Sequence, residues 1–88
     1  MVSGSYYHSK FVGRPMACGG RYDHEELTAA SNRYPCNTRL LVRRGERTVE
    51  VRVTDRCGRC GIDLSKAAAR ELGLHSAGRA PVHVTVAD

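Results

Sequence analysis

The fold of this chain is decided by the stretch Thr48-Val49-Glu50-Val51-Arg52-Val53-Thr54, in which valines alternate with charged residues. Alternation with a period of two places the valines on one face of a β-strand and the charged side chains on the other. Before it, Arg39-Leu40-Leu41-Val42-Arg43 has the composition of a partner strand, and Arg44-Gly45-Glu46 has that of a turn. These residues therefore predict a β-hairpin with a valine-lined inner face.

Shorter patterns predict the elements around the hairpin. The run Val82-His83-Val84-Thr85-Val86 predicts the last strand, with Val84 and Val86 facing the interior, and Ser5-Tyr6-Tyr7-His8 predicts a short first strand. The segment Asp23-His24-Glu25-Glu26 has the capping-box pattern of one helical turn. Ser65 is a favourable N-cap for a helix that ends before Gly73.

The order of these elements predicts a mainly β fold. It does not alternate strand and helix in the way that a parallel α/β sheet requires. A small closed barrel with one or two short helices in its connections fits the order, because closure leaves no exposed strand edge. A chain of 88 residues has room for one domain only, which we place at residues 1–88.

Composition and charge exclude several classes of protein. No apolar run approaches the roughly 20 residues that span a bilayer, so we expect no membrane span. The start, Met1-Val2-Ser3-Gly4, lacks the charged and apolar regions of a signal peptide. The composition also excludes a coiled coil and a large cofactor enzyme, and we expect no cofactor.

The net charge of +5 comes from scattered arginines, which favours attraction to an anionic cell wall over nucleic-acid binding.

The four cysteines, Cys18, Cys36, Cys57 and Cys60, indicate disulfides. An even number of cysteines in a short chain is typical of proteins from an oxidising compartment. The spacing of Cys57 and Cys60 also occurs in zinc sites, but these usually add a second such pair or two histidines, and neither pattern is present. The favoured interpretation is disulfides and no metal, with free thiols or zinc as the alternatives.

Seven motifs occur in order along the chain. They are Ser5-Tyr6-Tyr7, Ala17-Cys18-Gly19, Tyr22-Asp23, Leu27-Thr28-Ala29-Ala30-Ser31, Pro35-Cys36-Asn37-Thr38, Val53-Thr54-Asp55-Arg56 and Ile62-Asp63-Leu64-Ser65-Lys66-Ala67-Ala68. Together, from about Gly4 to Val86, they resemble the RlpA-like double-psi β-barrel, a branch of the barwin, expansin and family-45 endoglucanase group. The resemblance implies a six-stranded double-psi β-barrel outside the cytoplasm that acts on or binds cell-wall polysaccharide.

The resemblance also implies details that local patterns leave open. It implies a strand over Leu27 to Ala30, where local propensity favours a helix, and a sixth short strand around Ile62-Asp63-Leu64. By analogy with the barwin and expansin barrels, it implies a disulfide between Cys18 and Cys36. That pairing leaves Cys57 and Cys60 to form a tight clip within one loop.

The RlpA branch implies lytic transglycosylase activity on peptidoglycan strands stripped of their stem peptides. Its pattern has an acidic residue, a histidine and an aspartate; the matching positions here are Gly20, Ser31 and Asp55, so only the aspartate is kept. One carboxyl group can protonate the bridging oxygen and remove the proton of the 6-hydroxyl in turn, which makes Asp55 the candidate catalytic acid/base. The alternative role of Asp55 is to accept backbone hydrogen bonds in a tight turn.

We expect substrate contacts from several residues near Asp55. Flat aromatic faces suit sugar rings, although adjacent residues of a strand point in opposite directions, so one of the two neighbouring tyrosines is expected in the core. Asp23 is the other acid that we expect near Asp55, whereas Asp63 is expected to stabilise the start of the following helix. The expected substrate-binding residues are Tyr6, Tyr7, His8, Asp23, Ser31 and Arg56.

Three functions are consistent with these features. The first is a peptidoglycan lytic transglycosylase, and the second is a non-catalytic wall-binding component of a phage tail or secreted assembly. The third is a small secreted cysteine-protease inhibitor, because the Ala17-Cys18-Gly19 loop and the turn from Asp55 to Cys60 resemble those of papain inhibitors. All three place the protein outside the cytoplasm: secreted, periplasmic or virion-associated.

Overall fold

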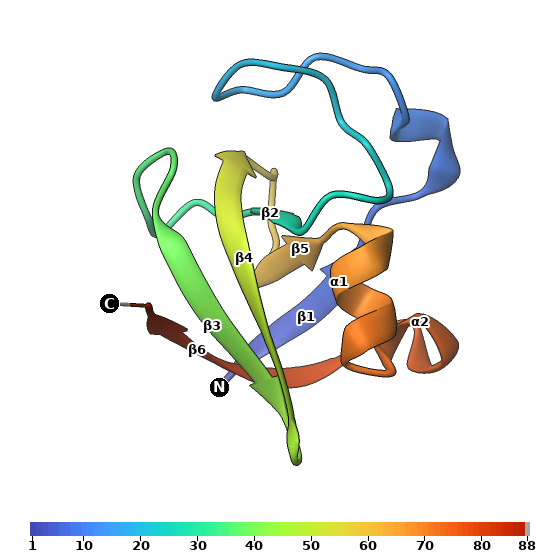
Figure 1. The fold of residues 1–88 in the computed structure, drawn as a ribbon, viewed down its shortest axis with the longest axis vertical. Coiled ribbons are helices and arrows are strands. Elements are labelled where there is room, and N and C mark those ends of the chain that lie inside the picture. The colour runs from blue at the N-terminus through green and yellow to red at the C-terminus, as the bar shows by residue number, and fades with distance from the viewer. Residues whose placement is uncertain (88) are drawn as a thin grey trace.

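The computed structural model describes residues 1–87, which form six strands and three short helices (Figure 1). The strands are β1 (Val2–Tyr6), β2 (Thr28–Ala30), β3 (Arg39–Arg44), β4 (Arg47–Asp55), β5 (Ile62–Leu64) and β6 (Ala80–Val86). The helices are the 3₁₀ turn η1 (Ser9–Phe11), α1 (Lys66–Glu71) and α2 (Leu74–Ala77). The strands close into a barrel in the order β1-β5-β2-β4-β3-β6, which confirms the predicted barrel with short helices.

The predicted hairpin is the largest part of the barrel. Strands β3 and β4 pair antiparallel, with Leu40 opposite Val51 and Val42 opposite Val49. These four side chains and that of Val53 are buried in the main core. Burying a side chain of this size contributes roughly 1.5–3 kcal/mol, so the inner face of the hairpin is a principal source of stability.

The short strands pair with partners that are far away in the sequence. Strand β1 runs parallel to β5 and antiparallel to β6, and β2 runs parallel to β4 and antiparallel to β5. The close approach of β1 and β6 depends on Gly4, because a Cβ atom there would lie 3.1 Å from Cγ1 of Val82. The short strands β2 and β5 therefore lie next to each other in the middle of the barrel wall.

Some predicted details of β1, β2 and β6 differ from the structure. Strand β1 starts at Val2 and ends at Tyr6, so Tyr7 and His8 leave the sheet and begin the long connection to β2. Leu27 lies outside β2 and is 44% exposed. The prediction that Val86 fills the interior is wrong, because β6 ends at the rim of the barrel and leaves Val86 52% exposed, while Val84 packs against the core.

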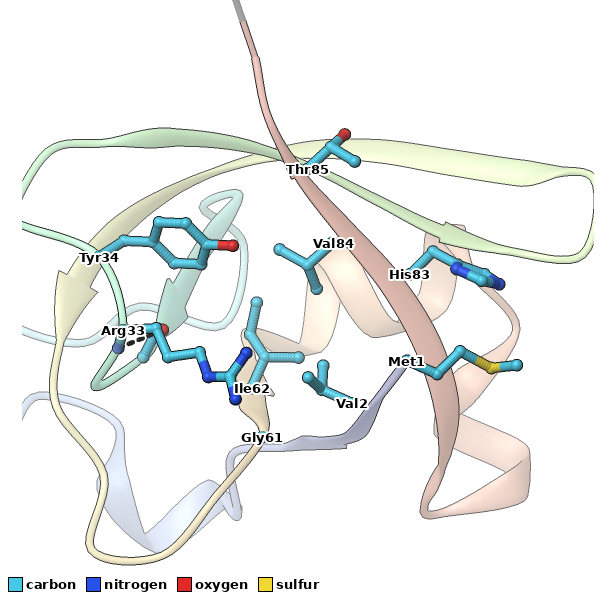
Figure 2. A pocket seen from close by; sticks show the side chains of 10 residues that line it. Met1, Val2, Arg33, Tyr34, Gly61, Ile62, His83, Val84 and Thr85 are labelled. Atoms are coloured by element: carbon cyan, nitrogen blue, oxygen red, sulfur yellow. Dashed lines mark hydrogen bonds between the residues drawn. The ribbon is translucent and has the colours of Figure 1, made fainter.

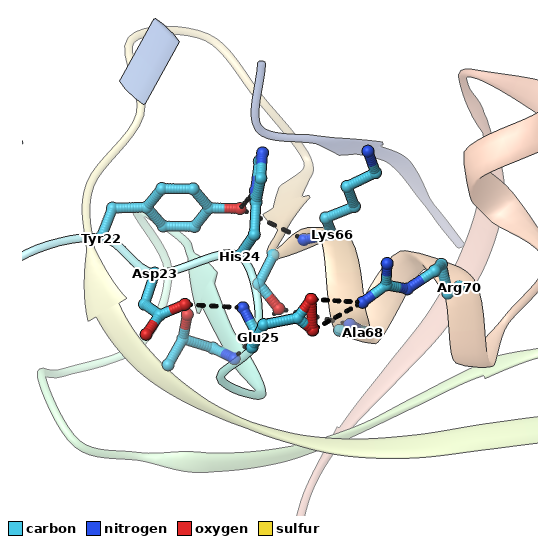
Figure 3. Close-up of polar contacts among 9 residues, drawn as sticks. Tyr22, Asp23, His24, Glu25, Lys66, Ala68 and Arg70 are labelled. Carbon is cyan, nitrogen blue, oxygen red and sulfur yellow. Dashed lines mark hydrogen bonds and ion pairs between the residues drawn. The ribbon is translucent and has the colours of Figure 1, made fainter. Parts of the chain in front are cut away.

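The predicted helical turn at residues 23–26 is also wrong. The side chain of Asp23 accepts a hydrogen bond from the backbone N–H of Glu25 at 2.8 Å and forms a tight turn instead. Aspartate side chains compete with the helix for nearby backbone donors, which accounts for the difference. The turn is attached to α1 by an ion pair between Glu25 and Arg70 at 2.8 Å (Figure 3).

Helix α1 forms at the predicted place with the predicted ends. The Ser65 side chain accepts a hydrogen bond from the backbone N–H of Ala68, and Gly73 follows the helix with a φ of 66°. The left-handed conformation is the one that glycine adopts at least cost. Within residues 1–87, no helix combines the length and apolar character that crossing a bilayer requires.

The two disulfides pair as the resemblance implied. Cys18 bonds to Cys36, and Cys57 bonds to Cys60. The first bridge joins residues 18 positions apart, which in the chain-entropy treatment stabilises the fold by about 3 kcal/mol. It attaches the long β1–β2 connection to the segment before β3. In Figure 1 this connection arches over the end of the barrel where β4 terminates.

Two valine truncations test the assignment of inner and outer positions. We expect Val51→Ala to lower the free energy of unfolding by about 1–3 kcal/mol, through lost burial and a cavity. Val86→Ala removes the same atoms from an exposed site and should have almost no effect. Urea denaturation of both variants measures the difference, and equal effects would contradict the observed register.

Candidate functional site

Asp55 lies at the end of β4 beneath the long β1–β2 connection. Its Oδ2 accepts a hydrogen bond from the Tyr7 hydroxyl at 2.8 Å. Its Oδ1 accepts two more, from the backbone N–H of Ala17 at 2.8 Å and from that of Arg56 at 2.9 Å. One carboxylate thus joins the start of the β1–β2 connection, the middle of that connection and the turn after β4.

Tyr7 is held in place by burial and by stacking. Its side chain is 7% exposed, and its ring lies parallel to that of Tyr22, with centroids 4.0 Å apart. Burial, together with the hydrogen bond to Asp55, raises the pKa of the Tyr7 hydroxyl well above its usual range. Tyr7 therefore keeps its proton and acts as a donor to the Asp55 carboxylate.

Tyr22 extends this cluster toward helix α1 (Figure 3). Its hydroxyl lies 2.6 Å from Nδ1 of His24 and accepts a hydrogen bond from the backbone N–H of Lys66 at 3.2 Å. Burial raises the pKa of Tyr22 to about 12, although the contact with Lys66 opposes the shift. Two stacked, protonated tyrosines therefore separate Asp55 from the start of α1.

A second carboxyl group, that of Asp63, lies level with Asp55 in the barrel wall. Ala30 on β2 is paired with Asp55 on one side and with Asp63 on the other. The register of β2 and β4 shifts between Ala29 and Ala30, and this irregularity brings Asp55 opposite Ala30. Two strand spacings separate the backbones of Asp55 and Asp63 by about 10 Å. The acid that the topology aligns with Asp55 is thus Asp63, whereas the sequence analysis expected Asp23.

The surroundings of Asp63 favour its protonated form. Burial raises the pKa of this carboxyl group, and the charge of Asp55 acts in the same direction. A hydrogen bond from Oγ of Ser5 at 3.1 Å and the charge of Arg79 oppose the shift. The two acids therefore have different environments: Asp55 accepts three hydrogen bonds, and Asp63 is half-buried beside a serine.

Arg56 and Ser31 shape the loop on the other side of Asp55. The guanidinium of Arg56 donates to the carbonyl oxygens of Ser31 at 2.8 Å and Tyr34 at 2.9 Å. Ser31 is buried, its backbone N–H donates to the carbonyl of Asp55 at 3.1 Å, and its Oγ accepts from the backbone N–H of Arg33. Arg56 thus fastens the loop that follows β2 to the end of β4.

The other expected binding residues lie at the edge of this cluster. The hydroxyl of Tyr6 donates to the carbonyl of His75 at 3.0 Å, and the ring of His8 accepts from the backbone N–H of Lys10. Tyr6, Tyr7 and His8 line one shallow hollow together. Asp23 is exposed, and its side chain is engaged in its own turn.

One further hollow adjoins the end of β4, and another lies beside the loop that follows β2. One, of about 430 Å³, is bordered by Gly20 and Thr54, and the other, of about 220 Å³, is bordered by Ser31 and Tyr34. Within residues 1–87, no three His, Cys, Asp or Glu side chains gather in a way that would hold a metal ion.

Comparison with known proteins identifies the family. Residues 1–84 match the double-psi β-barrel family model described as lytic transglycolase. The chain belongs to this family. The Synechocystis protein ssl3177 is 42% identical over 85 residues, which cover 94% of this chain and 93% of that protein. The endolytic peptidoglycan transglycosylase RlpA of Pasteurella multocida is 46% identical over 86 residues, which cover 91% of this chain.

Two further facts bear on how far the family likeness extends. The matched region is only 29% of the length of the Pasteurella RlpA, so this chain spans less than a third of that relative. The solved structure of the Streptomyces papain inhibitor superposes with a TM-score of 0.77 and 27% identity, covering 94% of this chain and 87% of that one. The double-psi β-barrel is thus shared by relatives of different function.

The environment of Asp63 predicts how stability depends on pH. An acid whose pKa is raised by folding binds more protons in the folded state, so its ionisation lowers stability as pH rises above about 4. Asp63→Asn removes this penalty and keeps an acceptor for Ser5. We expect the stability of the variant relative to wild type to increase from pH 3 to pH 7, measured by urea denaturation. The exposed control Glu46→Gln should show no such trend, and a constant difference for Asp63→Asn would contradict the assignment.

Proposed function

We propose that this domain cleaves the glycan strands of peptidoglycan as a lytic transglycosylase, with Asp55 as the acid/base. The observation that carries the proposal is the position of Asp55. It is the one acidic or histidine residue of the RlpA pattern that the chain keeps, and it lies at the end of β4 next to Thr54, which borders a surface hollow. The match to the lytic transglycolase family over residues 1–84 supports the same reaction class.

The proposed reaction needs one proton carrier and no water. The 6-hydroxyl oxygen of the muramic sugar attacks C1 of the same sugar, and the bond from C1 to the bridging oxygen breaks. Asp55 gives a proton to the leaving oxygen and takes the proton of the attacking hydroxyl, so its protonation state is restored. The hydrogen bonds from Tyr7, Ala17 and Arg56 orient the carboxyl group for both transfers.

Charge and disulfides support a location at the cell wall. The net charge of +5 favours approach to an anionic polymer. The two disulfides favour an oxidising compartment, so we place the protein outside the cytoplasm. Peptidoglycan is accordingly the proposed substrate.

At the two positions where this chain departs from the RlpA pattern, the structure favours small side chains. Gly20 has a φ of 75°, where a side chain costs about 1–2 kcal/mol of backbone strain. Ser31 is 1% exposed, and a larger side chain there would have to displace its neighbours. We therefore propose that this barrel works with Asp55 alone and more slowly than relatives that keep all three residues.

The test is product formation from purified sacculi whose stem peptides have been removed. We expect wild-type protein to release anhydro-muramic products, detected by mass spectrometry, and Asp55→Asn to release none, because an amide cannot exchange the proton. The control Glu46→Gln changes an exposed acid in the turn between β3 and β4 and should stay active. Full activity of Asp55→Asn would limit this residue to a structural role. Wall binding without any product would make the domain a binding module.

A second candidate function is inhibition of a cysteine protease. It is favoured by the likeness to the Streptomyces papain inhibitor, which extends over nearly the whole of both chains. The exposed Arg59 in the loop closed by Cys57 and Cys60 is a feature that could enter a protease cleft. Papain titrated with the wild-type protein distinguishes the candidates: tight inhibition without wall products supports the inhibitor, and unaffected papain excludes it.

A further inference from the structure

A small pocket opens between β6 and the loop that follows β2 (Figure 2). Its volume is about 220 Å³, below the roughly 300–1,000 Å³ of pockets that hold drug-sized ligands. It therefore has room for one small chemical group rather than for several sugar rings. The proposed reaction at Asp55 makes no use of it.

The floor of the pocket is aliphatic. It is formed by Val2, Ile62 and Val84, which come from β1, β5 and β6. Ile62 is 1% exposed, and Val2 and Val84 pack against the same core. Figure 2 shows these three side chains side by side at the centre of the pocket. Such a floor favours a methyl group over a charged or hydroxylated one.

The rim of the pocket is polar and carries a positive charge. Arg33, Tyr34 and His83 surround the aliphatic floor, and no acidic side chain borders the pocket among the described residues. The guanidinium of Arg33 reaches over the floor toward Ile62 in Figure 2. Within residues 1–87, the structure gives the Arg33 side chain neither a hydrogen bond nor an ion pair.

An unpaired guanidinium above an aliphatic floor defines the chemistry of a ligand. The planar guanidinium binds a carboxylate through two parallel hydrogen bonds, a geometry that an ammonium group does not provide. We propose that this pocket binds a carboxylate whose neighbouring carbon carries a methyl group, that is, a 2-substituted propionate. The carboxylate pairs with Arg33, and the methyl group rests on Val84 and Ile62.

The choice of peptidoglycan as the source of this ligand rests on the proposed function. Peptidoglycan presents the 2-substituted propionate in two places. One is the lactyl ether of muramic acid, whose carboxylate is free when the stem peptide has been removed. The other is the terminal alanine of an intact stem peptide. Binding of the first would select stripped strands, and binding of the second would select strands that keep their peptides.

Methyl-labelled protein allows both sources to be tested by NMR without any cleavage. N-acetylmuramic acid represents the first source, and N-acetylglucosamine, which lacks the lactyl ether, is its control. N-acetyl-D-alanyl-D-alanine represents the second source, and its C-terminal amide is the control. We expect at least one acid to shift the methyl signals of Val84 and Ile62 with a dissociation constant of about 1 mM, and both controls to leave them unchanged.

Matched arginine variants decide whether Arg33 is responsible. Arg33→Gln should weaken binding about tenfold or more, and Arg33→Lys should weaken it less. Arg47→Gln removes the same charge from the distant hairpin turn and should bind as wild type does. The proposal is overturned if neither acid shifts these methyl signals, if acid and control act alike, or if Arg33→Gln binds normally. Because the readout is binding, these outcomes are independent of whether Asp55 supports cleavage.

Discussion

The carboxylate of Asp55 is the contact on which the arrangement of the site depends. Hydrogen bonds to a charged group contribute roughly 1.5–3 kcal/mol each, and this carboxylate accepts three. They attach the connection between β1 and β2 to the barrel at a point where that connection has almost no regular secondary structure of its own. The stacking of Tyr7 on Tyr22 and the bridge between Cys18 and Cys36 add two further attachments.

The structural role of Asp55 and its proposed catalytic role are compatible. The sequence analysis treated a turn acceptor and an acid/base as alternatives, yet the observed donors engage both oxygens without burying the residue fully. The same donors that hold the β1–β2 connection also orient the carboxyl group. Tyr7 is one of them, because its hydroxyl remains protonated. Gly20 and Ser31, the small residues at the two altered positions of the pattern, each border a surface hollow.

Local patterns predict the parts of this fold that depend on nearby residues. The alternation of valines in β4 and the cap at Ser65 predicted the hairpin and α1, and the resemblance supplied β5 and the disulfide pairing. The position of Asp63 could not be predicted in this way, because it depends on Ala30 pairing with two strands from distant parts of the chain. Its one local signal is a lone acid between the buried residues Ile62 and Leu64.

The most direct test of this account is the energetic coupling between Tyr7 and Asp55. A double-mutant cycle with Tyr7→Phe, Asp55→Ala and the double variant measures it from urea denaturation, and the loss of the other contacts of Asp55 cancels in the cycle. If the phenol–carboxylate hydrogen bond joins the connection to the barrel, the coupling energy should be about 1–3 kcal/mol. Additivity of the two single effects within about 0.5 kcal/mol would contradict the account.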